Sequence, residues 1–146
     1  MSQLPSPDSE QLAQAASWRS MDAVVRGDKQ AWLENFADDA IVEDPVGPSL
    51  VDPTGEGHHG KAAIEQFWDK NIANARPMFS LQSSLCCGNE CANIGTLTIQ
   101  FPNGLVTQLY GVFIYRVNEA GKVISLRTYW EGDGMKIFPP FDERGA

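Results

Sequence analysis

Four strand-like runs separated by short turns occupy the second half of the chain and restrict its fold more than any other feature. They cover residues 78–85, 91–100, 105–117 and 122–130. The turns between them contain residues typical of turns, namely Cys87-Gly88-Asn89, Pro102-Asn103-Gly104 and Asn118-Glu119-Ala120-Gly121. Consecutive strands joined in this way predict an antiparallel meander.

The first half of the chain shows helical signals instead. We expect Asp8 or Ser9 to cap a first helix over residues 10–25, which stops at Gly27. Asp28 then caps a second helix, whose apolar face carries Trp32, Leu33, Phe36 and Ala37 at helical spacing. A third helix follows over residues 61–75. The order α-α-β-α-β-β-β-β predicts the α+β class, a curved antiparallel sheet with its helices on one face.

The first strand of this order, residues 40–44, places a carboxylate among apolar side chains. Alternation puts Val42 and Asp44 on the same face, and Pro45 ends the strand. Burial there would raise the pKa of Asp44, which makes it a candidate general base. The alternative is an aspartate that ends a strand and accepts a loop N–H. Residues 45–60 form a long loop rich in proline and glycine, and such loops are usually functional or disordered.

Length and charge limit the partners. The 146 residues suit one domain, placed at residues 10–131 between a flexible leader, 1–9, and a C-terminal tail, 132–146. A net charge of −8 without a basic run disfavours nucleic acid, which binds clustered Lys and Arg. No stretch approaches the roughly 20 apolar residues of a membrane helix, and the acidic start lacks the features of a signal peptide. We therefore expect a soluble, cytoplasmic protein that binds no membrane.

Two motifs have ordinary interpretations. The spacing of Cys86, Cys87 and Cys91 matches no zinc knuckle, and we expect free thiols, with a Cys86–Cys91 bridge across a hairpin as the alternative. Gly55 to Gly60 read G-x-G-x-x-G, but the strand that a dinucleotide site requires before this motif is missing. Adjacent His58 and His59 could not easily share a metal; we expect a surface loop pair, with a role at a pocket rim as the alternative. No metal or organic cofactor is expected.

Three segments carry a resemblance to a known family. Phe36-Ala37-Asp38-Asp39-Ala40-Ile41-Val42-Glu43-Asp44-Pro45-Val46-Gly47, with Gly60-Lys61-Ala62-Ala63-Ile64, resembles the bacterial Δ5-3-ketosteroid isomerases, as does the segment 118–127. The resemblance covers most of residues 10–131. Residues 18–19, 111–118 and 127–130 are still more similar to an actinobacterial branch of isomerase-like proteins. The resemblance to the isomerases implies the cone-shaped, cystatin-like fold of nuclear transport factor 2 (NTF2-like), the SnoaL-type polyketide cyclases and scytalone dehydratase. Proteins with this fold are usually dimeric through the sheet.

The same resemblance implies the roles of three residues. In these isomerases an aspartate moves a proton between two carbons of the steroid, opposite an oxyanion hole made of a tyrosine and a protonated aspartic acid. The aspartate falls on Asp44. Ser20 and Phe113 stand where the tyrosine and the protonated aspartic acid would be. Trp68, Trp130, or Ser20 with a bound water, are the candidate replacements, since an indole N–H can donate.

The sequence therefore predicts proton transfer next to a carbonyl of a steroid-like or polyketide-like substrate, with Asp44 as the base or its remnant. Two alternatives are a non-catalytic binder of flat lipophilic molecules and a protein-binding scaffold. The resemblance also implies a homodimer, because Arg127 and Tyr129 face away from the pocket side on the last strand of a sheet that the isomerase family buries against itself. Besides Ser20, the candidates for the wall of a deep apolar pocket are Phe36, Val46, Phe67, Trp68, Phe113, Tyr115, Leu126 and Trp130.

Overall fold

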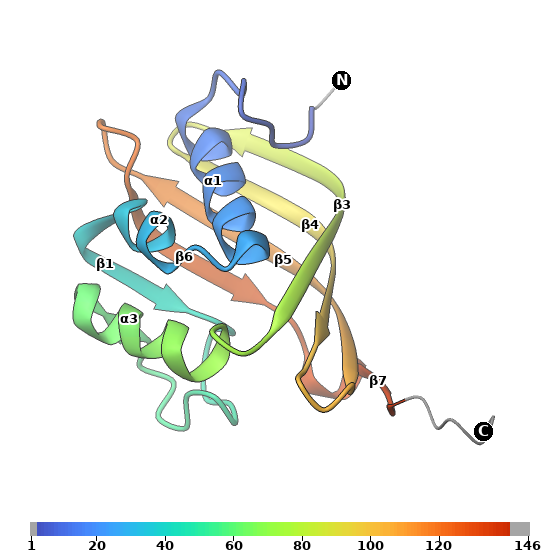
Figure 1. The fold of residues 1–146 in the computed structure, drawn as a ribbon. Coiled ribbons are helices and arrows are strands. Elements are labelled where there is room, and N and C mark those ends of the chain that lie inside the picture. The colour runs from blue at the N-terminus through green and yellow to red at the C-terminus, as the bar shows by residue number, and fades with distance from the viewer. Residues whose placement is uncertain (1–2, 141–146) are drawn as a thin grey trace.

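The computed structural model describes residues 3–140, so the first two residues of the expected leader and the last six of the expected tail lie outside the described residues. Its elements follow the expected order, with two short strands added (Figure 1). They are α1 (Leu12–Arg26), α2 (Lys29–Glu34), β1 (Phe36–Glu43), β2 (His58–His59), α3 (Gly60–Asn71), β3 (Arg76–Cys87), β4 (Glu90–Gln100), β5 (Val106–Val117), β6 (Val123–Tyr129), a 3-10 turn (Gly132–Gly134) and β7 (Lys136–Phe138).

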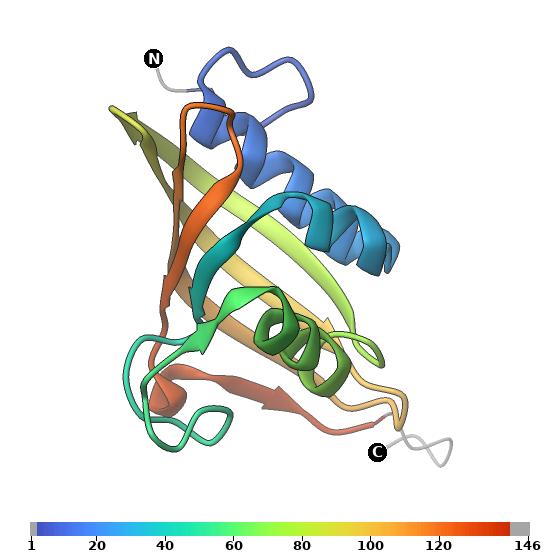
Figure 2. The same ribbon diagram turned by 90° about the vertical axis from the view of Figure 1, so that its left-hand side faces the viewer.

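The strands form one sheet in the order β2-β1-β6-β5-β4-β3, and β7 pairs with β5. Strands β3 to β6 are the expected antiparallel meander, whereas β1 joins β6 in parallel. Figure 2 shows the sheet curving around α1, α2 and α3, which lie together on one side of it. The α+β class and the single-sided arrangement of the helices are therefore confirmed.

The boundaries of the helices differ from the expected ones at three points, of which one is the end of α3, at Asn71 instead of residue 75. Asp28 caps α2 as expected, because its Oδ1 accepts the N–H of Ala31 at 3.0 Å. α1 ends at Gly27 in the left-handed conformation, but it begins after Gln11, with no side-chain cap from Asp8 or Ser9.

The third difference concerns the end of α2. This helix stops at Glu34, so Phe36 opens β1 instead of lying on a helical face. The cause is Asn35, whose carbonyl accepts the N–H of Val123 while its side chain donates to the carbonyl of Ala16. Because of these long-range hydrogen bonds, α2 ends at Glu34, about one turn before the expected end, and β1 begins at Phe36.

Two expectations for the loops and cysteines were wrong. His58 and His59 form β2, a two-residue strand that pairs with Ile41 and Val42 at the sheet edge, and not a surface loop. Cys86 and Cys91 are direct cross-strand partners in β3 and β4 and form a disulfide, so only Cys87 is a free, exposed thiol. Cross-strand pairing brings the two sulfurs together, so the alternative of a bridge across the hairpin is the one that the structure shows.

The core lies between the helices and the concave face of the sheet. Its largest fully buried apolar side chains are Trp32, Phe36, Ile64, Val42, Val117 and Val123. Among residues 3–140, no helix is long and apolar enough to cross a membrane.

Candidate active site

An apolar cavity of about 310 Å³ opens between the helices and the sheet. This volume is at the lower end of the range for small-molecule sites, and most of its wall is apolar. Buried residues such as Ser20, Trp32 and Tyr115 line its inner end, while exposed Lys70 and Val51 line its outer end. The cavity is therefore a pocket closed at the sheet and open toward the end of α3.

The structure brings most of the predicted pocket residues together. The members that line this cavity are Ser20, Asp44, Phe67, Phe113, Tyr115, Leu126 and Trp130. The other three lie elsewhere. Phe36 packs edge-on against Trp32 in the core, Trp68 packs behind Trp32 at 5.3 Å between ring centroids, and Val46 faces the outer side of the sheet.

Asp44 directly follows β1 and is held from β6 and the residue after it. Both Thr128 Oγ1 and Trp130 Nε1 donate to the same oxygen, Asp44 Oδ1, the latter at 2.9 Å. Asp44 Oδ2 has no protein partner within residues 3–140. The carboxylate is thus fixed in orientation by one oxygen and leaves the other free beside the cavity.

The surroundings of Asp44 raise its pKa above the ordinary value. Burial is the largest cause, because an apolar wall disfavours the ionised form. The hydrogen bonds from Thr128 and Trp130, and the nearby His58, act in the opposite direction and lower the pKa. The net effect is a raised pKa of Asp44, which is the direction that suits a general base working near neutral pH.

His58 lies behind the wall near Asp44. Its ring centroid is 4.9 Å from that of Phe67, which lines the cavity. Its Nε2 is buried and has no hydrogen-bond partner in the part of the chain that the structure describes. His58 is therefore not on the cavity surface itself, whereas His59 is exposed and meets the carbonyl of Glu56.

Polar groups from three elements meet at the inner end of the cavity. Trp32 Nε1 donates to Ser20 Oγ at 3.1 Å, and Ser20 Oγ lies 2.9 Å from the hydroxyl of Tyr115. Sequence reasoning named Ser20 and Tyr115 but placed Trp32 only on an apolar helical face. The indole N–H of Trp32 is the feature that could have indicated a polar partner, since buried tryptophans usually find one.

Two of the expected replacement donors have other surroundings. The indole N–H of Trp130 is already directed at Asp44, and Trp68 does not line the cavity. Phe113 lines the cavity and packs edge-on against Phe79 at 5.8 Å between centroids, so it offers no hydrogen bond. The structure thus leaves the hydroxyls of Ser20 and Tyr115, next to the indole N–H of Trp32, as the polar groups at the inner end.

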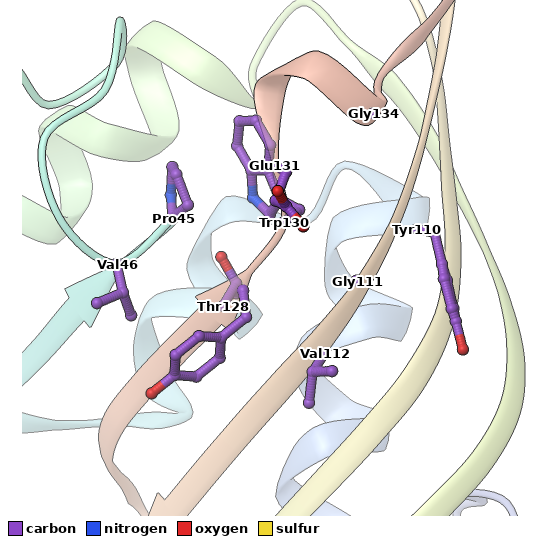
Figure 3. A pocket seen from close by; sticks show the side chains of 10 residues that line it. Pro45, Val46, Tyr110, Gly111, Val112, Thr128, Trp130, Glu131 and Gly134 are labelled. Carbon is purple, nitrogen blue, oxygen red and sulfur yellow. The ribbon is translucent and has the colours of Figure 1, made fainter.

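A second hollow, of about 650 Å³, lies on the outer side of the sheet (Figure 3). Pro45 and Val46 stand on one side of it and Tyr110 and Val112 on the other (Figure 3). It is larger than the inner cavity, but the carboxyl of Asp44 does not line it. We therefore place the candidate active site in the inner cavity, which the carboxylate of Asp44 and the hydroxyls of Ser20 and Tyr115 all line.

Comparisons with known proteins agree with this geometry. The SnoaL-like domain model matches residues 19–126. A steroid Delta-isomerase of Nocardioides simplex is 29% identical over 126 residues, covering 86% of this chain and 94% of that protein. The Δ5-3-ketosteroid isomerase of Mycobacterium sp. superposes with a TM-score of 0.84 at 40% identity, covering 88% of this chain and 99% of that one.

A second similar structure contains a steroid. It is a Mycobacterium tuberculosis protein in complex with estradiol-17beta-hemisuccinate, with a TM-score of 0.83 and 36% identity, covering 87% of this chain and 99% of that one.

Proposed function

The chain belongs to the SnoaL-like domain family, and we propose that it transfers a proton next to a carbonyl of a steroid-like or polyketide-like substrate, with Asp44 as the base. The observation that carries this proposal is the carboxylate of Asp44, held by two donors on Oδ1 while Oδ2 stays unpaired beside an apolar cavity. Such an arrangement suits a base that must accept a proton and return it without rotating.

The chemistry follows from this geometry. Asp44 Oδ2 removes a proton from the carbon next to the carbonyl, and the electron pair moves to the carbonyl oxygen, giving a dienolate. The enolate oxygen then gives its electron pair back to re-form the carbonyl, the electrons of the dienolate take the proton from the carboxyl at another carbon, and the carbon–carbon double bond has moved while Asp44 is ionised again. Burial that raises the pKa of Asp44 assists the first step, because a stronger base takes a carbon-bound proton more readily.

The test is isomerisation of a Δ5-3-ketosteroid, followed by the absorbance of the conjugated product. We expect Asp44→Asn to lower kcat by about 10²–10⁴, the usual contribution of a positioned base. The control is Glu43→Gln, because Glu43 lies one residue away and pairs with Arg127 at 2.6 Å on β6. Equal loss in both variants, or no loss in Asp44→Asn, would contradict the proposal.

A second candidate function is the non-catalytic binding of flat lipophilic molecules. It is favoured by Phe113, which lines the cavity at the position where the resembled isomerases have a hydrogen-bond donor to the carbonyl oxygen. Its ring packs against Phe79 and donates no such bond. The similar Mycobacterium tuberculosis protein crystallised with a steroid ester is consistent with it. Measurable binding of several enones without turnover of any of them would select this function over the first.

We also propose that the protein is a homodimer through the outer side of its sheet. Arg127 and Tyr129 are exposed there, and Tyr110 adds a second exposed aromatic ring beside the outer hollow. Sedimentation at micromolar concentration should give twice the chain mass. A monomer mass would refute this proposal.

A further inference from the structure

Three side chains at the inner end of the cavity hold one more donor proton than they can use among themselves. Trp32, Ser20 and Tyr115 are 1%, 1% and 4% exposed, and they are joined by two hydrogen bonds. The indole N–H, the serine hydroxyl and the phenol hydroxyl supply three protons. Two hydrogen bonds use two of them, so one hydroxyl proton remains for a ligand.

The direction of the hydrogen bond between Ser20 and Tyr115 decides which of the two hydroxyls keeps that proton. An indole can only donate, so Ser20 Oγ accepts from Trp32. Either hydroxyl can donate in the contact between Ser20 Oγ and the Tyr115 hydroxyl. We take Ser20 as the donor, because hydrogen bonds strengthen one another when each group donates onward in the same direction. Ser17, one turn before Ser20 on α1, donates to the carbonyl of Ala13 and takes no part in this set of hydrogen bonds. When Ser20 donates to Tyr115, the phenol proton is the free one, and Tyr115 lines the cavity.

We propose that Tyr115, supported by Ser20 and Trp32, donates the hydrogen bond to the substrate carbonyl oxygen as it becomes the enolate oxygen. The proposal rests on the proposed function of Asp44 and names the electrophile for the same reaction. It replaces the donors that the family pattern would put at Ser20 and Phe113 by a hydroxyl from β5.

The position of Tyr115 relative to the base supports this role. Tyr115 pairs with Leu126 across β5 and β6, and Phe113 pairs with Thr128, which holds Asp44. Tyr115 and Thr128 are therefore diagonal neighbours on one face of the sheet, roughly 7–8 Å apart in such pairs. A carbonyl held by Tyr115 leaves its neighbouring carbons within the part of the cavity that Asp44 lines.

The electrostatics keep Tyr115 in its donating form. Burial is the main cause that raises the pKa of its phenol, and the carboxylate of Asp44 raises it further, while the hydrogen bond with Ser20 acts in the opposite direction. The phenol therefore stays protonated through the range in which Asp44 is ionised and able to act as a base. In a chain of three aligned donors, each hydrogen bond also strengthens the next.

The test compares Tyr115→Phe with the wild type and with Tyr129→Phe, a control on the outer, exposed side of β6. For a Δ5-3-ketosteroid, Tyr115→Phe should lower kcat by about 10²–10³, the usual effect of removing one oxyanion donor, with a smaller change in KM. Ser20→Ala should lower kcat less, because it removes only the support of the phenol. A larger loss in Ser20→Ala than in Tyr115→Phe would overturn the assignment.

A second measurement does not depend on turnover. The probe is androstenedione, whose ring A carbonyl should show a lower infrared stretching frequency in the wild-type complex than in the Tyr115→Phe complex. Its affinity should fall about 2–10-fold in Tyr115→Phe, whereas an analogue without that carbonyl should bind both proteins equally. An unchanged frequency and affinity would refute the donor role.

The two proposals can fail separately. Loss of activity in Asp44→Asn together with full activity in Tyr115→Phe would leave the base assignment standing and reject the donor. Full activity in Asp44→Asn, together with a carbonyl frequency that depends on Tyr115, would reject the base assignment and leave the donor assignment standing.

Discussion

The two hydrogen bonds on Asp44 Oδ1 should set how basic this carboxylate is, and each can be removed without changing the shape of the site much. Thr128→Val removes the hydroxyl and keeps the branched side chain, and Trp130→Phe removes the indole N–H and keeps an aromatic ring. Both bonds favour the ionised carboxylate and lower its pKa. Each substitution should therefore raise the pKa of Asp44 further.

The expected size follows from the strength of such bonds. A hydrogen bond to an ionised group contributes about 1.5–3 kcal/mol, and one pKa unit corresponds to about 1.4 kcal/mol. Each substitution should raise the pKa by about 1–2 units. Since Asp44 acts as a base only when ionised, the acid limb of the kcat/KM profile should move to higher pH by the same amount.

Carbon-13 NMR of the aspartate carboxyl groups measures this pKa without a substrate. The resonance of Asp44 is the one that disappears in Asp44→Asn, and its titration is followed in Thr128→Val and Trp130→Phe. Tyr129→Phe is the control, because Tyr129 lies between these two residues but is exposed on the opposite face of the sheet. An unchanged or lower pKa in both test variants would refute the reasoning.

Three further outcomes are expected elsewhere in the molecule. A raised pKa of Asp44 stabilises the fold below the ordinary value of 3.8, and this contribution is lost as the pH rises through the folded pKa. Asp44→Asn should therefore raise the unfolding free energy at neutral pH by about 0.5–2 kcal/mol, with the gain vanishing in acid, as measured by urea unfolding at both pH values. Gly95→Ala should destabilise by about 1–3 kcal/mol in the same assay, because a Cβ there would lie 2.7 Å from the Cα of Leu81. Alkylation followed by mass spectrometry should label Cys87 alone in the native protein and all three cysteines after reduction and denaturation.

The sequence predicted the meander well because each of its strands is long, alternating and bounded by turn residues. The errors occurred where long-range contacts override local preference. Phe36 has helical spacing after Trp32, but the hydrogen bond from Val123 to the carbonyl of Asn35 ends the helix first. His58 and His59 make a strand of two residues, which is too short to show any alternation.

The candidate site was predicted in part for a similar reason. Asp44 and the inner faces of β5 and β6 follow from alternation along single strands, and the structure places them on one cavity. The contact between Ser20 and Tyr115 joins residues 95 positions apart, on a helix and on a strand. No periodicity within either element indicates which hydroxyl the other will meet, so the polar end of the cavity could be recognised only in three dimensions.

The position of the base and the pairing of the sheet depend on the same contacts. β1 lies parallel to β6 with Val42 opposite Leu126 and Glu43 opposite Arg127, and the N–H of Val46 continues the pairing at 2.9 Å to the carbonyl of Thr128. The side chain of Thr128 holds Asp44. A slip of one residue between these strands would turn Asp44 to the outer side of the sheet, because side chains alternate between faces. Thr128 therefore continues the strand pairing with its backbone and orients the carboxylate of Asp44 with its side chain, so the candidate active site is assembled by the same strand pairing that completes the fold.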